Sequence, residues 1–322
     1  MLNNIRNIAI LRALQLGDLL CAVPAFRALR AAFPESEITL LGLPWAAEFV
    51  SRFSRYIDHF VHFPGVAGLP EQAPGDFDAF AEAMRAKHFD LLVQMQGSGC
   101  IVNGLLPELG AQLTAGFWKP PEDCPNPLSF LPYPEHPHEI HRHLALLQYL
   151  GIPLWGDYLE FPITPTDEAE YRLLNLDAEH HQYVCIHPGS RDPSRQWPVE
   201  YFAKVADVLA EEGWPVILTG TEGEKELTQA VMQQMQHPAI DLAGRTTLGS
   251  LAVLLRGARL LVSNCTGAAH VSYALRTPSV VISMDGEPAR WGPLNTALHH
   301  LYDWKKDQEL GQVIDSAIEL SR

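Results

Sequence analysis

Short apolar segments alternate with helical segments along most of this chain of 322 residues. The first, residues 7–14, is almost continuously apolar, as strands buried on both faces of a parallel sheet are. A helix is predicted over residues 19–33 and a second strand over residues 37–43. A strand, a helix and a strand in this order form a parallel sheet with helices packed on its faces. The sequence therefore predicts an α/β fold.

The alternation of strands and helices is interrupted in the middle of the chain. Residues 114–133 are rich in proline and are predicted to be irregular. A helix is predicted over residues 138–150, followed by Gly151, a typical residue after a helix C-terminus. Residues 153–165 have little periodicity and form the candidate linker, beyond which the alternation resumes.

A chain of this length is natural for two domains. We expect an N-terminal domain over residues 1–160 and a C-terminal domain over residues 161–322, each an α/β unit with its own parallel sheet. The predicted last helix, residues 307–320, is a candidate for packing back on the N-terminal domain.

A loop rich in glycine, serine and arginine follows a strand of the second half. Residues 184–197 read VCIHPGSRDPSRQW. Gly189 lets the backbone approach an anion, Ser190 donates a hydrogen bond, and Arg195 offers a planar fork to phosphate oxygens. An ordinary connecting loop with surface arginines has the same composition, so this loop alone does not indicate a ligand.

A second loop of the same kind follows a later strand. Residues 260–270 read LLVSNCTGAAH, with Asn264, Thr266 and Gly267 at the predicted start of a helix. Helix N-termini favour phosphate, and open α/β sheets bind ligands at the carboxyl ends of their strands. The two loops together predict a diphosphate site. His270 can donate to a phosphate there or be a buried, hydrogen-bonded histidine, and the sequence supports both equally.

An acidic residue occupies the corresponding turn of the first half. Residues 13–20 read ALQLGDLL, which places Asp18 between a strand and a helix. Asp18 can act as a general base that takes a proton from a substrate hydroxyl. It can also act as the N-cap of the helix, where aspartate is a favoured residue. The two roles are compatible.

Charge and composition exclude several classes of function. The formal net charge of −15 argues against broad nucleic-acid binding and disfavours non-specific binding to anionic membranes. No apolar run approaches the roughly 20 residues of a membrane span, and the N-terminus is a poor signal peptide. The five cysteines form no C-x-x-C pair, which suggests reduced thiols. We expect a cytoplasmic protein.

Two patterns resemble metal sites. Residues 76–78 spell D-x-D, but they follow a Pro/Gly-rich loop and open a predicted helix, which favours helix capping. Four histidines lie near the start of the helix predicted over residues 138–150, but they do not share one face, and a solvated helix start is the preferred interpretation. These histidines are His136, His138, His141 and His143. We therefore predict no metal site.

Several of these segments resemble glycosyltransferase family 9, the lipopolysaccharide heptosyltransferases. The most specific are the Gly-Asp turn at residues 17–18, the basic-x-Trp-Pro segment at residues 195–198 and the Ser-Asn-x-Thr-Gly-x-x-His segment at residues 263–270. Further matching stretches, in the same order as in the family, include HRHLALLQYLGI, VILTGTEGEKE and IDLAGRTTLGSLAVLLRGARL. Residues 56–137 carry little of the resemblance.

This resemblance implies a GT-B architecture, in which two Rossmann-like domains with parallel sheets face each other across a cleft. It implies an inverting glycosyltransferase that needs neither a metal nor a cofactor. The C-terminal domain would bind a nucleotide-diphosphate sugar, commonly ADP-heptose, and the N-terminal domain a Kdo- or heptose-bearing lipid A core or another glycan acceptor. A lipid-linked acceptor would bring the protein into transient contact with the inner-membrane surface.

The family's site residues can be carried over to this sequence. The catalytic aspartate of the family falls on Asp18. The family's contacts to the donor fall on Arg195, Thr266 and Gly267, and on either Glu222 or Glu224, between which the spacing does not decide.

The chain departs from the family at Cys265, where an aspartate is usual. A thiol supplies neither the charge nor the hydrogen bonds of a carboxylate. Three alternatives remain: Glu287 in the next loop compensates, the chain uses another donor, or it is a weakly active or non-catalytic nucleotide-sugar-binding member. A nucleotide-sugar 2-epimerase shares the two-domain architecture and is a further alternative, although the additional acids expected around its donor phosphates are not evident in the sequence.

Overall fold

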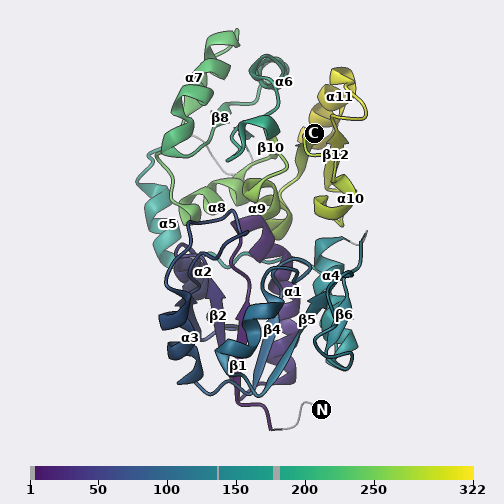
Figure 1. Ribbon diagram of the computed structural model, residues 1–322. Helices are drawn as coiled ribbons and strands as arrows, with labels where there is room; N and C mark the ends of the chain where they lie inside the picture. Colours follow the sequence, from purple (N-terminus) through teal and green to yellow (C-terminus); the bar gives the residue numbers. More distant parts are fainter. Residues whose placement is uncertain (1–3, 136–137, 177–181) are drawn as a thin grey trace. The chain divides into compact units, whose positions relative to one another are not determined.

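The computed structural model describes residues 4–135, 138–176 and 182–322. Two compact units divide the chain, Met1–Asp157 and Tyr158–Arg322, and each is an α/β unit (Figure 1). No regular element lies between residue 150 and residue 164, the stretch that contains the boundary.

The N-terminal unit is built around a parallel sheet. Its described strands are β1 (Asn7–Leu11), β2 (Glu37–Gly42), β3 (His59–His62), β4 (Leu91–Gln94), β5 (Leu113–Trp118) and β6 (Phe130–Pro132). They pair in the order β3-β2-β1-β4-β5-β6, and every pair is parallel. The helices are α1 (Leu16–Ala32), α2 (Ala46–Arg52), α3 (Phe77–Arg85) and α4 (Glu139–Tyr149), with a 3-10 helix η1 (Asn103–Leu109).

The C-terminal unit repeats this plan. Its described strands are β7 (Val184–His187), β8 (Val216–Leu218), β9 (Ala239–Asp241), β10 (Leu260–Asn264), β11 (Ser279–Ser283) and β12 (His299–Asp303). They pair in the order β12-β11-β10-β7-β8-β9, again with every pair parallel. The helices are α5 (Pro165–Arg172), α6 (Val199–Glu211), α7 (Lys225–Gln234), α8 (Leu248–Gly257), α9 (Gly267–Leu275), α10 (Pro288–Trp291) and α11 (Leu310–Ser321), with 3-10 helices η2 (Pro193–Arg195) and η3 (Glu222–Glu224). The last helix, α11, packs against α6, β10 and β11 of its own unit.

The strand order places a ligand-binding edge in each unit. Read from the first strand of each half, both sheets have the order 3-2-1-4-5-6 of a Rossmann fold. The connections leave β1 and β4 toward opposite sides of the N-terminal sheet, and they do the same at β7 and β10 in the C-terminal sheet. Ligands of such sheets bind outside the carboxyl ends of the strands at this point.

Both sheets are buried between their helices. In the N-terminal unit, Ile8, Ala9 and Ile10 of β1 are fully buried. In the C-terminal unit, Trp197 packs edge-to-face on Phe202 and on Trp304, with ring centroids 5.0 Å apart in both pairs.

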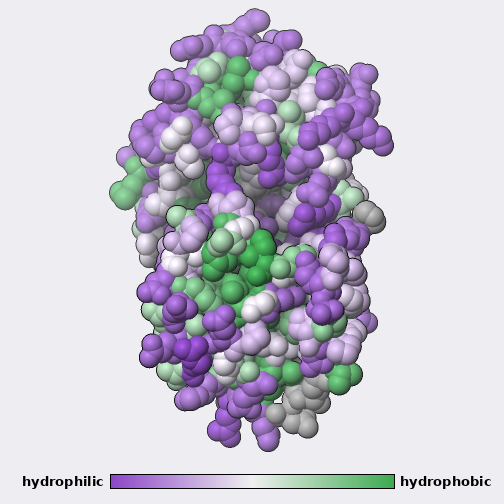
Figure 2. Space-filling model, viewed as in Figure 1, coloured by the Kyte–Doolittle hydropathy of each residue, from purple (hydrophilic) through white to green (hydrophobic). Residues whose placement is uncertain are grey.

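The surface of the N-terminal unit has a hydrophobic area. Figure 2 shows hydrophobic residues gathered on the visible face of this unit. None of the helices in the described ranges combines the length and apolar composition that a membrane span requires.

The sequence missed elements where local signals are weak. Residues 114–133 were predicted to be irregular, but they contain most of β5 and all of β6. The single proline of β6, Pro132, is tolerated because β6 is an edge strand. Strand β12 and the short helix α10 were not predicted either. The capping prediction for residues 76–78 is confirmed, since the Asp76 side chain accepts a hydrogen bond from Ala79 N.

Candidate active site

The loop after β7 is held in shape by a buried asparagine. Asn264, at the end of β10, accepts a hydrogen bond from Trp197 N at 2.9 Å and donates to Pro188 O at 2.7 Å. Its side chain is fully buried and connects the two ends of the loop. Asn264 therefore shapes this loop, which carries Ser190 and Arg195, and its predicted contact with the donor stays a prediction.

Arg195 lies where three loops meet at the carboxyl edge of the C-terminal sheet. Its guanidinium forms an ion pair with Asp285, which follows β11, and its Nη2 lies 3.4 Å from Cys265 O, which follows β10. Burial alone would raise the pKa of Asp285, but hydrogen bonds from Ser283 and Glu287 N and the Arg195 charge outweigh it and lower that pKa. The Arg195 side chain is 38% exposed, so it remains accessible to an anion.

Cys265 presents its backbone to this edge and its side chain to the core. The residue is 6% exposed and packs with Ala269 and Val281 in an apolar cluster. Burial, with a smaller contribution from Asp285, raises the pKa of the thiol to about 12, so the thiol is neutral. The carboxylate beside Arg195 is that of Asp285. Glu287 instead pairs with Arg290, at 3.4 Å.

The N-terminus of α9 opens at the same edge. Thr266 is its N-cap residue and Gly267 its first residue. The first N–H groups of a helix have no partner within the helix and favour an anion. Within the described part of the chain, the buried Thr266 hydroxyl has no hydrogen-bond partner. His270 is 4% exposed, and its ring packs edge-on against Tyr273, with centroids 5.5 Å apart.

Glu224 lies within this edge. A Cβ placed on Gly189 would lie 2.2 Å from Glu224 Oε1, so the glycine is needed for this close approach. The same carboxylate accepts hydrogen bonds from Thr221 N at 2.7 Å and Thr221 Oγ1 at 2.9 Å. Burial lowers the pKa of the neighbouring His187, against the opposing effect of Glu224. Glu224 thus faces the loop that follows β7.

Glu222 points to a different loop. Its Oε1 lies 2.6 Å from Lys225 Nζ, and its side chain is 74% exposed. A Cβ on Gly244, in the loop after β9, would lie 2.2 Å from Glu222 Oε2. Of the two glutamates that the sequence left open, Glu224 is the one beside Gly189.

Asp18 lies at the carboxyl edge of the N-terminal sheet, in the first turn of α1. The N-cap of α1 is Gln15, so the prediction that Asp18 is the N-cap is wrong. Asp18 is the third residue of the helix, and its Oδ2 accepts a hydrogen bond from Gln15 N at 3.3 Å. Its side chain is 24% exposed, and its Oδ1 lies 3.8 Å from Nη2 of the buried Arg12.

Comparison with known protein families identifies the family of this chain. The model of glycosyltransferase family 9 (heptosyltransferase) matches residues 77–313, which is most of the chain.

The chain belongs to glycosyltransferase family 9.

Relatives and solved structures extend the match over nearly the whole chain. Lipopolysaccharide heptosyltransferase 2 of Escherichia coli K12 is 24% identical over 294 residues, covering 87% of this chain and 83% of that protein. The structure of E. coli ADP-heptose LPS heptosyltransferase II aligns with a TM-score of 0.76 at 20% identity, over 98% of each chain. The structure of E. coli heptosyltransferase WaaC with ADP aligns with a TM-score of 0.69 at 18% identity, over 98% of this chain and 100% of that chain. The GT-B fold expected from the sequence is confirmed.

Sequence reasoning missed three residues of this family 9 glycosyltransferase. Arg12 lies 3.8 Å from Asp18 and also contacts Glu139, and Asp285 pairs with Arg195. Asp285 follows a predicted strand two residues before the glutamate that the sequence singled out, so its position was the available signal. Arg12 had no signal, because its partner Glu139 is 127 residues away.

Three of the four histidines considered as metal ligands lie in the described residues, and each has a different partner. His138 accepts a hydrogen bond from Ile140 N, His141 lies 3.1 Å from Asp157 Oδ2, and His143 is buried beside Glu139. His136 lies outside the described residues. Among the described residues, no cluster of three or more His, Cys, Asp or Glu side chains has the arrangement of a metal site.

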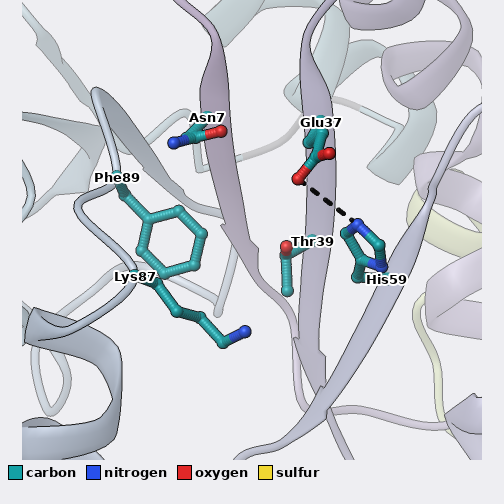
Figure 3. Close-up of a pocket in the computed structure, with 6 residues that line it drawn as sticks. All are labelled: Asn7, Glu37, Thr39, His59, Lys87 and Phe89. Carbon is teal, nitrogen blue, oxygen red and sulfur yellow. Dashed lines mark ion pairs between the residues drawn. The ribbon is translucent and has the colours of Figure 1, made fainter.

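A pocket in the N-terminal unit lies at the opposite edge of the sheet from Asp18. It is lined by the first residues of three strands, by Thr39 of β2, and by two residues that precede β4, as Figure 3 shows: Asn7, Glu37, Thr39, His59, Lys87 and Phe89. The pair between Glu37 and His59, at 3.4 Å, is more than half exposed at both partners. Exposed pairs of this kind contribute little energy. The pocket is therefore not our candidate active site.

Proposed function

We propose that this family 9 glycosyltransferase transfers heptose, or a related sugar, from an ADP-sugar to a lipopolysaccharide core or a similar glycan acceptor. The transfer inverts the anomeric carbon and uses no metal. The heptosyltransferase relatives support the sugar and the lipopolysaccharide acceptor, and the WaaC structure with ADP supports the nucleotide. The family match favours transfer over 2-epimerisation.

The convergence of three anion-binding features supports the proposed donor site. Arg195, the N-terminus of α9 and the Gly189 loop converge at the carboxyl edge of a single sheet. An arginine fork and helix N–H groups are the donors that a diphosphate accepts from, and they can stabilise it as it leaves. Thr266 Oγ1 supplies a further unused donor, and Glu224 is suited to accept from ribose hydroxyls.

The acceptor reacts at Asp18. An acceptor oxygen forms the new bond to the anomeric carbon of the donor sugar as the bond from that carbon to the diphosphate oxygen breaks. The hydroxyl proton passes to Asp18, which acts as general base. The negative charge that develops on the diphosphate is met by Arg195 and the α9 N-terminus.

Asp285 bears on the question raised by Cys265. The usual carboxylate is missing at residue 265, but a carboxylate still lies beside Arg195, held by Ser283 at 2.7 Å. This supports an active enzyme over a non-catalytic binder. The hydrophobic residues on the N-terminal unit (Figure 2) suit an amphiphilic acceptor and transient contact with a membrane surface.

Product analysis tests the proposed function directly. The purified chain is incubated with ADP-heptose and deacylated core acceptors that end in Kdo or in heptose, and products are identified by mass spectrometry. Titration calorimetry with ADP, UDP, GDP and CMP is run in parallel. We expect a preference for ADP and a glycosylated product. Nucleotide binding without transfer would favour the non-catalytic alternative, and no nucleotide preference would contradict every version of the proposal.

A further inference from the structure

Four ionisable side chains form a buried cluster, and one of them, Arg12, lies beside Asp18. Arg12 follows β1, while Glu139, Arg142 and His143 lie in the first turns of α4. All four are at most 2% exposed. Helix α4 packs against α1, which carries Asp18.

Arg12 connects this cluster to Asp18 with its whole guanidinium. Its Nε donates to the backbone oxygen of Asp18 at 2.9 Å, and its Nη1 donates to Met95 O, after β4. Its Nη2 lies 3.3 Å from Glu139 Oε1 and 3.8 Å from Asp18 Oδ1. One side chain at the end of β1 therefore contacts the first turn of α1, the residue after β4 and the first turn of α4.

The cluster contains more positive charge than Glu139 requires. Arg142 already forms an ion pair with Glu139 and also lies over the Tyr133 ring, 4.5 Å from its centroid. Burial, with Arg12 next, lowers the pKa of His143 to about 4, so this residue is neutral at pH 7. Two guanidinium groups and one carboxylate leave one net positive charge in the interior.

Burial alone would raise the pKa of Glu139, but the adjacent His143 ring, 3.4 Å away, and the charges of Arg12 and Arg142 outweigh it and hold that pKa well below its usual range. Glu139 therefore stays ionised. A buried cation is costly unless it is paired. Glu139 is shared between Arg12 and Arg142, and the further carboxylate within 4 Å of Arg12 is that of Asp18.

We propose that Arg12 is the positioning residue for Asp18. It holds the Asp18 turn through the backbone carbonyl and keeps a positive charge beside the carboxylate that takes the acceptor proton. Arg142 stabilises Glu139 and the fold, without this function. The role rests on the proposed transferase function, since it is defined by what Asp18 does there.

The test compares two arginines that share one carboxylate. Arg12→Gln and Arg142→Gln each remove a cation from Glu139, and Arg12→Lys keeps the charge at residue 12 but loses the guanidinium fork. For each variant, kcat, the donor KM and Tm are measured. We expect Arg12→Gln to lower kcat by about tenfold to a hundredfold, as displacement of a catalytic group by about 1 Å does, with little change in donor KM. Arg12→Lys should recover part of this loss, and Arg142→Gln should lower Tm with kcat reduced less than about threefold.

The outcomes separate the two proposals. No transfer by the wild type would overturn the proposed function, and the positioning role with it. Transfer by the wild type with an unchanged kcat in Arg12→Gln, or an equal loss of kcat in Arg142→Gln, would overturn the positioning role alone. If Arg12→Gln does not fold, Arg12→Lys decides, because a wild-type kcat in that variant would mean that the fork is not needed.

Discussion

The two units have the same strand order but opposite chemistry at their carboxyl edges. At the N-terminal edge, the Asp18 carboxylate is partly exposed and its positive partner, Arg12, is fully buried. At the C-terminal edge, the positive Arg195 is exposed and its carboxylate partner, Asp285, is more buried. The difference teaches that the Rossmann topology supplies only a place for a ligand. Which charge faces the ligand depends on which partner of each ion pair the packing buries.

The largest effect is expected at Asp18. Asp18→Asn should reduce kcat by at least about a hundredfold, because a neutral amide cannot take a proton. The start of α1 should be preserved, since an amide oxygen can still accept from Gln15 N. ADP affinity, measured by calorimetry, should stay unchanged, because we propose that ADP binds at the C-terminal edge. Asp78→Asn is the matched control, an exposed acid in the first turn of α3. Normal turnover of Asp18→Asn would make Asp18 a structural residue only.

The next effect concerns the exposed cation of the C-terminal edge. Arg195→Ala should weaken ADP binding by about tenfold to a hundredfold, the usual range for losing a charged hydrogen bond. Arg191→Ala serves as control, because Arg191 is an exposed arginine of the same loop with the same charge. Equal losses in both variants would mean that the loop attracts ADP by its overall charge and that the position of Arg195 does not matter.

A smaller effect should follow from displacing Glu224. In Gly189→Ala, the new methyl group would lie 2.2 Å from the Glu224 carboxylate, which must move. We expect ADP affinity to fall by about twofold to tenfold, the loss of a typical hydrogen bond, with little change in Tm because the displaced atoms end a flexible side chain. Gly223→Ala is the control, since its nearest contact would be Thr221 Oγ1 at 4.0 Å. An unchanged affinity in Gly189→Ala would exclude Glu224 from the donor site.

The last prediction compares a buried histidine in each unit. Burial, the largest cause in both, lowers the pKa of His143 and of His299 to about 4 from the usual histidine value of 6.5. Between these values the unfolded chain binds protons that the folded chain does not, so stability falls as the pH drops from 6.5 to 4. Each histidine should lower the free energy of unfolding by about 1–3 kcal/mol over this pH range. The free energy of unfolding, measured by urea denaturation at several pH values, should depend less on pH in His143→Gln and in His299→Gln than in the wild type. An unchanged pH dependence in both variants would contradict both pKa shifts.

The candidate donor site could be predicted from sequence because its signals are local. Gly189, Thr266 and Gly267 each lie at a junction between a strand and a helix, and the two loops taken together predict an anion site. The choice between Glu222 and Glu224 could not be made, because side chains two residues apart can point to different loops and only the packing shows which. Strand β6 was missed because the many prolines of residues 114–133 are typical of a loop, whereas the edge of the sheet accepts Pro132.

The sequence by itself determined the fold class, the family and the two strand–loop–helix turns that carry Asp18 and Arg195, since periodicity and short motifs are properties of neighbouring residues. The tertiary structure alone decided which charges are paired at each edge. Arg12 meets Glu139 across 127 residues, and Arg195 meets Asp285 across 90 residues. Such partners are selected by strand order and helix packing, and no local pattern in the chain records them.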